Sequence, residues 1–121
     1  MNELSGAIVD AAFAVHSELG PGLLEIVYEQ CLLIELQERG LGVDRQVDLP
    51  VIYKGQSTGT GFRIDLLVEN SIVLELKAID TILPVHKAQI LTYLKLTDHR
   101  LGLLINFNVT KIKHGIHRVI L

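Results

Sequence analysis

The stretch that decides the fold reads Gly61-Phe62-Arg63-Ile64-Asp65-Leu66-Leu67-Val68 and, three residues later, Ile72-Val73-Leu74-Glu75-Leu76-Lys77. Apolar side chains recur at the even-numbered positions of both runs, and this period of two predicts half-buried strands with one shared apolar face. The intervening Glu69-Asn70-Ser71 has turn chemistry, so we expect an antiparallel hairpin with a three-residue loop centred on Asn70.

The length of this loop fixes which side chains face each other. It sets Asp65 opposite Glu75, with Lys77 two residues further along. Two opposed carboxylates repel, which a sheet built only for stability would avoid. A hard divalent cation removes the repulsion, because Mg²⁺ is commonly held by one or two carboxylates and several waters. The pattern therefore indicates a metal site beside a lysine; a solvated sheet face with a local ion pair, worth about 0–1 kcal/mol, remains the alternative.

Composition limits the class of protein. The chain has 121 residues, 49% of them hydrophobic, which predicts one domain over residues 1–121 with a largely aliphatic core. Cys31 is the only cysteine, so neither a disulfide framework nor a cysteine zinc cluster is expected. No leader-like segment and no long apolar run stands out, and we expect a soluble, cytoplasmic protein with no membrane contact. The net charge of −3 predicts weak nucleic-acid binding by an isolated subunit.

Periodicity and breakers predict the remaining elements. Helical spacing favours a first helix that ends before Gly20-Pro21-Gly22, and a second that stops at Gly40. Pro50 favours an edge position for its strand, whereas the very apolar run that begins at Leu101 is typical of a central strand. The predicted helices cover residues 3–19, 23–39 and 85–97, and the predicted strands cover 43–47, 49–56, 61–68, 72–77, 101–107 and 116–121. This order indicates an α/β sandwich with a mixed central β-sheet flanked by helices.

Polar side chains recur on two of the predicted helices. Glu25 and Tyr28 lie three residues apart on one face near the start of the second helix, where a carboxylate can simply complement the helix dipole. His86, Gln89 and Tyr93 form one polar stripe on the third helix, which by itself is ordinary for an exposed helix.

Taken together, these motifs resemble a known family. Gly61-x-x-x-Asp65, Glu75-Leu76-Lys77 and Gln89-x-x-x-Tyr93, in this order, are similar to the signature of the PD-(D/E)xK nuclease superfamily, and more narrowly to its branch of RecB-type and lambda-exonuclease-type nucleases. Gly22-x-x-Glu25-x-x-Tyr28 matches the motif that names the GxxExxY protein family, and residues 101–108 (LGLLINFN) look like that family's characteristic strand. The resemblance extends over residues 4–119, although Ile64 stands where the usual proline precedes the first acid.

The resemblance implies a fold and an activity. The fold would be the restriction-endonuclease-like sandwich, and the activity metal-dependent hydrolysis of phosphodiester bonds in DNA, with RNA as the second choice. Asp65, Glu75 and the backbone carbonyl of Leu76 would ligate Mg²⁺ or Mn²⁺, and Glu25 would reach the ion directly or through water. Lys77 would position or help to deprotonate the attacking water and stabilise developing negative charge.

The same resemblance implies substrate-orienting residues and partners. Gln89 and Tyr93 would orient the substrate or brace the lysine, with Tyr28 and His86 as further orienting side chains. A nuclease-like fold that binds or regulates without turnover is the alternative, favoured by the acidic net charge and by the expected lack of an added substrate-gripping arm. The partner of the nuclease would be nucleic acid, in the first place DNA, whereas the silent module would bind nucleic acid or protein. A homodimer or a partner protein would supply the missing basic surface.

Overall fold

Two helices precede the sheet, and a third helix is inserted between two of its central strands. The computed structural model describes residues 2–121. Its elements are α1 (Asn2–Leu19), α2 (Glu25–Glu38), β1 (Val43–Tyr53), β2 (Gln56–Val68), β3 (Ile72–Lys77), α3 (Pro84–Thr97), β4 (Leu101–Asn106), a 3-10 turn η1 (Ile112–His114) and β5 (Ile116–Ile120).

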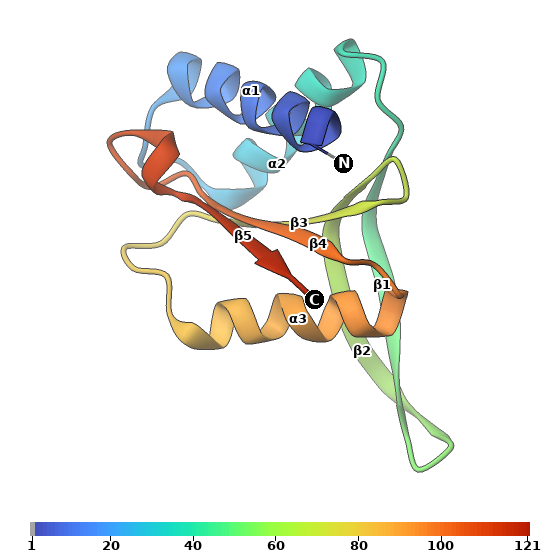
Figure 1. Cartoon of the computed structure of the whole chain (residues 1–121). Helices are drawn as coiled ribbons and strands as arrows, with labels where there is room; N and C mark the ends of the chain where they lie inside the picture. The colour runs from blue at the N-terminus through green and yellow to red at the C-terminus, as the bar shows by residue number, and fades with distance from the viewer. Residues whose placement is uncertain (1) are drawn as a thin grey trace.

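The sheet is mixed, as the sequence predicts. Its strand order is β1-β2-β3-β4-β5, and every neighbouring pair is antiparallel except β3 and β4. A parallel pair requires a crossover, which α3 provides. Helices α1 and α2 cover one face of the sheet and α3 covers the other, so the predicted α/β sandwich with flanking helices is confirmed (Figure 1).

The core consists of two clusters, one on each side of the sheet. Leu66 and Leu74 pack with α1 and α2, whereas Leu67 and Val73 pack under α3. Every β3 side chain from Ile72 to Leu76 is buried, so the expectation of half-buried strands is wrong for β3. The reason is its central position, because a strand that has neighbours on both edges and helices on both faces keeps no solvated side.

The hairpin that joins β2 and β3 has the predicted register. Val68 pairs with Ile72 and Leu66 with Leu74, around a three-residue loop. Glu69 and Asn70 take positive φ values of 52° and 47° in that loop, a conformation that asparagine tolerates better than most residues. The even-to-even pairing inferred from the periodicity is therefore confirmed.

Strands β1 and β2 are much longer than predicted. They form one antiparallel ribbon that turns at Lys54 and Gly55, both with positive φ, as in a tight two-residue hairpin. Only the last three residues of β2 pair with β3, so residues 56–65 pair with β1 alone. The ribbon projects past α3 as an arm, which the sequence pattern did not predict (Figure 1). Pro50 does lie in an edge strand, as predicted.

Within residues 2–121, no helix has the length and apolar character needed to cross a membrane.

Candidate active site

The site forms where the pairing of β2 with β3 ends. The backbone pairs stop at Leu66 and Leu74, and at the next position two carboxylates replace them. Asp65 N donates a hydrogen bond to Glu75 Oε1 at 3.1 Å, and Leu76 N donates one to Asp65 Oδ2 at 2.8 Å. The strands begin to separate here, and each carboxylate binds a backbone N–H of the opposite strand. Asp65 and Glu75 are thereby fixed next to each other.

Burial makes this pair electrostatically costly. Glu75 is 5% exposed and Asp65 is half-buried. Burial raises the pKa of Glu75 to about 8, with the neighbouring Asp65 charge adding to the effect. Burial also raises the pKa of Asp65 to about 6, although its hydrogen bond from Leu76 opposes the shift. The folded chain therefore holds two adjacent acids whose charges it does not neutralise.

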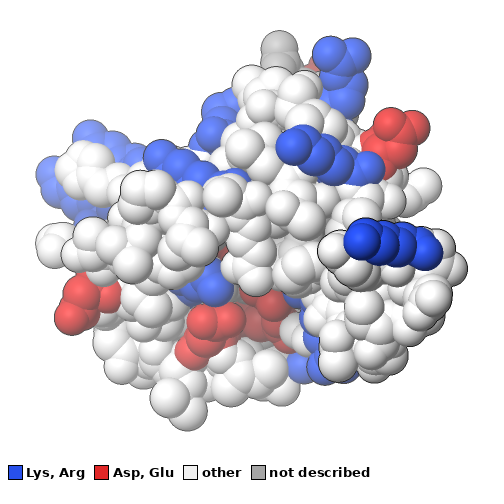
Figure 2. All heavy atoms as spheres, turned by 90° about the horizontal axis from the view of Figure 1, so that it is seen from below, with Lys and Arg blue, Asp and Glu red and all other residues white. Residues whose placement is uncertain are grey.

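Lys77 and Glu25 belong to the same electrostatic environment. The Lys77 charge lowers the pKa of both sheet acids and of Glu25, yet Lys77 forms no ion pair within residues 2–121. Glu25 is the first residue of α2 and is exposed, and partial burial raises its pKa. Seen from the side that α3 covers, acidic side chains gather in a hollow with basic side chains at its edge (Figure 2).

The donor set fits a hard divalent cation held by two carboxylates. Each acid uses one oxygen for a backbone N–H, and its other oxygen accepts no hydrogen bond within the described chain. No group of three or more His, Cys, Asp or Glu side chains in residues 2–121 is arranged to hold a metal ion. Mg²⁺ requires no such group, because one or two carboxylates and several waters commonly complete its shell. This geometry favours the water-mediated version of the role expected for Glu25.

Helix α3 brings two of the predicted polar side chains to the acids. Burial raises the pKa of Tyr93 to about 12, with further contributions from the charges of Glu75 and Asp65, and a hydrogen bond with Gln89 opposes the shift. The Tyr93 ring also lies 5.5 Å, centroid to centroid, from that of Phe62 on β2. Gln89 and Tyr93 therefore line the same site as the sheet acids.

His86 lies at the start of α3, further from the acids. Its Nδ1 accepts a hydrogen bond from Leu83 N at 2.9 Å, which caps the helix. Together with Gln89 and Phe62 it also lines a shallow groove of about 370 Å³. His86 thus has a structural role and stands at the border of a surface that leads to Gln89.

Tyr28 does not face the site, which corrects the expectation that it orients substrate. Its ring is fully buried and stacks on Phe107 with a centroid separation of 4.5 Å. Its hydroxyl donates to Gly20 O at 2.6 Å and accepts from Leu23 N at 3.1 Å. Tyr28 therefore fixes the loop that leads into Glu25, and its hydroxyl is hydrogen-bonded within the chain both as donor and as acceptor.

Sequence reasoning missed Glu29, a buried acid one helical turn after Glu25. It is 4% exposed and accepts hydrogen bonds from Arg45 Nε at 2.8 Å and Gln46 Nε2 at 2.6 Å. Its charge also contributes to the raised pKa values of Asp65 and Glu25. The spacing of four residues from Glu25 was the available signal, because residues i and i+4 share a helix face.

Comparison with known proteins gives one match. The family model described as the PD-(D/E)XK nuclease superfamily matches residues 2–119, which is nearly the whole chain. No curated protein and no solved structure matches.

Proposed function

The chain belongs to the PD-(D/E)XK nuclease superfamily, and on that premise we propose that it is a divalent-metal-dependent nuclease that hydrolyses phosphodiester bonds of DNA. The observation that carries the proposal is the cross-strand pair of Asp65 and Glu75, which forms no ion pair within residues 2–121 and in which both pKa values are raised. Within the superfamily, we place the chain in the GxxExxY group of the RecB and lambda-exonuclease branch, on the motif from Gly22 to Tyr28.

The metal-binding residues in this proposal are Asp65, Glu75 and the backbone carbonyl of Leu76, with Glu25 acting through water. All are oxygen donors, which suits Mg²⁺ or Mn²⁺. When bound, such an ion polarises phosphoryl oxygens and makes a coordinated water more acidic. The raised pKa values of Asp65 and Glu75 support this assignment, because a cation would restore both carboxylates to their charged form.

The other side chains act on the substrate and the attacking water. Lys77 presents a fixed ammonium group toward the acids, where it orients the water and stabilises charge that develops on the phosphate. Tyr93 is protonated at neutral pH, and because its pKa is raised to about 12 its hydroxyl stays a hydrogen-bond donor in alkaline solution as well. Gln89 orients Tyr93, and His86 lies further out along the same helix face.

The proposal is tested by hydrolysis assays on DNA and RNA with Mg²⁺ or Mn²⁺. Asp65→Ala and Lys77→Ala should each lower the rate by about 100-fold or more, because each removes a group that acts on the transition state. Glu38→Ala, an exposed acid at the opposite end of α2 from Glu25, is the matched control and should cleave normally. Circular dichroism must show that all three variants are folded.

Two results would contradict the proposal. Unchanged cleavage by folded Asp65→Ala would show that the acid pair does not act in the reaction. Binding of nucleic acid by the wild type, without cleavage of any substrate, would instead establish the silent binding module.

A further inference from the structure

The arm formed by β1 and β2 is the largest feature that the proposed site leaves unexplained. We define the arm as residues 49–64, a part of the ribbon in which β2 does not pair with β3; its base packs under α3 through Leu49, Phe62 and Ile64. Residues 52–61 are all exposed, and β2 pairs here with β1 alone. Figure 1 shows the arm projecting past α3, away from both helical layers. Asp65 follows the arm directly in β2, so the arm and one member of the acid pair share a strand.

The arm carries positive charge in an otherwise acidic chain. Its only charged residues are Lys54 at the turn and Arg63 near its base, whereas the whole chain has a net charge of −3. Arg63 Nε lies 2.9 Å from Asp48 Oδ1, but both side chains are more than half exposed. An ion pair this exposed is worth only about 0–1 kcal/mol, so a phosphate can replace the carboxylate as the partner of Arg63.

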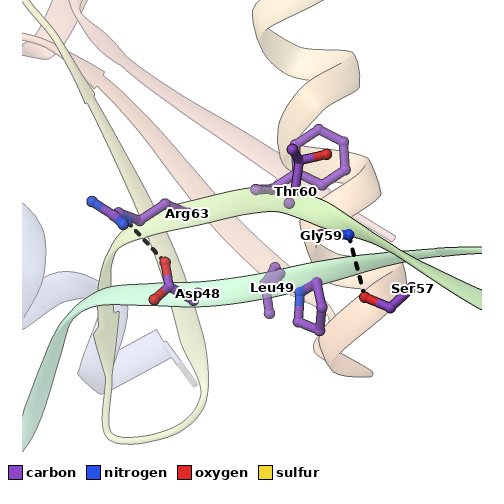
Figure 3. Close-up of a pocket in the computed structure, with 9 residues that line it drawn as sticks. Asp48, Leu49, Ser57, Gly59, Thr60 and Arg63 are labelled. Atoms are coloured by element: carbon purple, nitrogen blue, oxygen red, sulfur yellow. Dashed lines mark hydrogen bonds and ion pairs between the residues drawn. The ribbon is translucent and has the colours of Figure 1, made fainter.

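The remaining side chains of the arm suit a nucleic-acid backbone. Residues of both paired strands line an open groove of about 560 Å³, among them Ser57, Thr60 and Arg63 together with its partner Asp48 (Figure 3). Hydroxyl groups and backbone N–H groups are common donors to phosphate oxygens. At the turn, Tyr53 is 64% exposed and Lys54 Nζ lies 5.5 Å from the centre of its ring. Proteins that bind single-stranded nucleic acid stack the bases on exposed aromatic rings, with nearby cations adding to the attraction.

We propose that the arm binds the sugar-phosphate backbone of the substrate outside the bond that is cut. The inference rests on the proposed nuclease function and adds the surface that grips the substrate. Gln56 and Asp65 are nine positions apart in the sequence, which corresponds to about 30 Å of extended strand. Nucleic acid spans that distance with about nine nucleotides of one strand. Substrates that extend this far from the cleavage point should therefore benefit from the arm, and shorter ones should not.

The test measures binding of fluorescent DNA by the full chain in EDTA, over a salt series, with duplexes of roughly 24 and roughly 6 base pairs. Lys54→Ala should weaken binding of the long duplex and lower the salt slope by about 0.9, which is the loss of one phosphate contact. Tyr53→Ala should weaken binding of long single strands by about five-fold or more, because it removes a stacking ring. Lys113→Ala, in η1 on the opposite side of the molecule, is the matched control and should change neither (Figure 1).

Metal-dependent hydrolysis of a small phosphodiester by the same proteins separates this inference from the proposed function. If the arm grips the substrate, the arm variants hydrolyse the small compound normally. Normal hydrolysis together with unchanged DNA binding by both arm variants would overturn the arm proposal alone. A change from dimer to monomer in the arm variants, with DNA binding intact, would overturn it in favour of self-association. Arm-dependent DNA binding without hydrolysis of any substrate would support the arm and remove the proposed function.

Discussion

Glu29 lies close to the acid pair of Asp65 and Glu75, but the hydrogen-bond partners of these carboxylates differ in kind. Glu29 on α2 is almost fully buried, and it receives one side-chain donor on each oxygen, from Arg45 and Gln46. Asp65 and Glu75 receive only backbone N–H groups, and the nearest cation, Lys77, forms no ion pair within residues 2–121.

This difference separates an acid that the fold compensates from the two acids to which we assign the proposed function. A buried charge is tolerated when the chain pairs and hydrogen-bonds it, as it does for Glu29. Gln46 occupies the β1 position opposite Asp65, between the paired residues Arg45 and Val47. Its side chain is bonded to Glu29. Asp65 and Glu75 form no ion pair within residues 2–121, as expected if they bind the proposed cation.

The largest expected effect is a loss of stability at high pH in the absence of metal. Glu75 changes its pKa from 4.5 in the unfolded chain to about 8 in the folded one, so the folded state binds more protons across this range. The free energy of unfolding should therefore be highest below about pH 4.5 and fall until about pH 8, by a few kcal/mol at roughly 1.4 kcal/mol per pKa unit. Urea unfolding in EDTA at about pH 5 and about pH 8.5 measures this.

The matched variant for this prediction is Glu75→Gln, which keeps an oxygen for Asp65 N but carries no charge. It should flatten the pH dependence and be more stable than the wild type at the higher pH. Glu38→Gln at an exposed position should follow the wild type. If the free energy of unfolding of the wild type instead rises with pH, ionisation of the acid pair does not destabilise the folded state.

Glu29 should respond with the opposite sign. Glu29→Ala leaves the donors of Arg45 and Gln46 without their acceptor, which should lower the free energy of unfolding by about 1–3 kcal/mol at both pH values. Thermal or urea unfolding of the metal-free protein measures the change. Stabilisation by Glu29→Ala would place Glu29 with the functional acids and remove the distinction drawn between the two groups.

Local pattern was enough to predict the centre of this fold. The period of two and the turn residues at Glu69–Ser71 fix the pairing of Leu66 with Leu74, since only an even-to-even register keeps one apolar face together. That register alone brings Asp65 and Glu75 together. The continuous apolar run from Leu101 likewise predicted a strand buried on both faces.

Contacts between residues far apart in sequence explain what was missed. The predicted strands leave residues 57–60 as a connector that contains Gly59, yet these residues lie within β2. At the start of the predicted strand, a Cβ on Gly61 would stand 2.1 Å from the Leu49 carbonyl oxygen of the paired strand. Tyr28 shares a helix face with Glu25, but its burial depends on stacking with Phe107 from the opposite end of the chain. Glu29 is recognisable as a compensated acid only when β1 is in place.

Divalent metal should raise the free energy of unfolding, by less than the rise in pH lowers it. Because the ion binds the folded acid pair, Mg²⁺ at ten times its dissociation constant should raise the free energy of unfolding by about 1.4 kcal/mol. At a fixed Mg²⁺ concentration the gain should be larger at the higher pH. Asp65 and Glu75 have lost their protons there, so the ion does not have to displace them. Calorimetric titration and unfolding with and without Mg²⁺ should agree. The double variant Asp65→Ala, Glu75→Ala should show neither signal, and retained binding there would place the metal elsewhere.

The smallest expected effect tests whether Tyr28 has a structural role, like Glu29, or contacts the substrate. Tyr28→Phe keeps the ring against Phe107 and removes two hydrogen bonds, to Gly20 O and from Leu23 N. Since both backbone groups lie near solvent, the variant should lose only about 1 kcal/mol of unfolding free energy and bind Mg²⁺ as the wild type does. Steady-state kinetics then distinguish the two roles. If Tyr28 fixes the Glu25 loop, Tyr28→Phe should lower kcat with little change in KM. A rise in KM alone would indicate that Tyr28 contacts the substrate, which contradicts its burial in the structure.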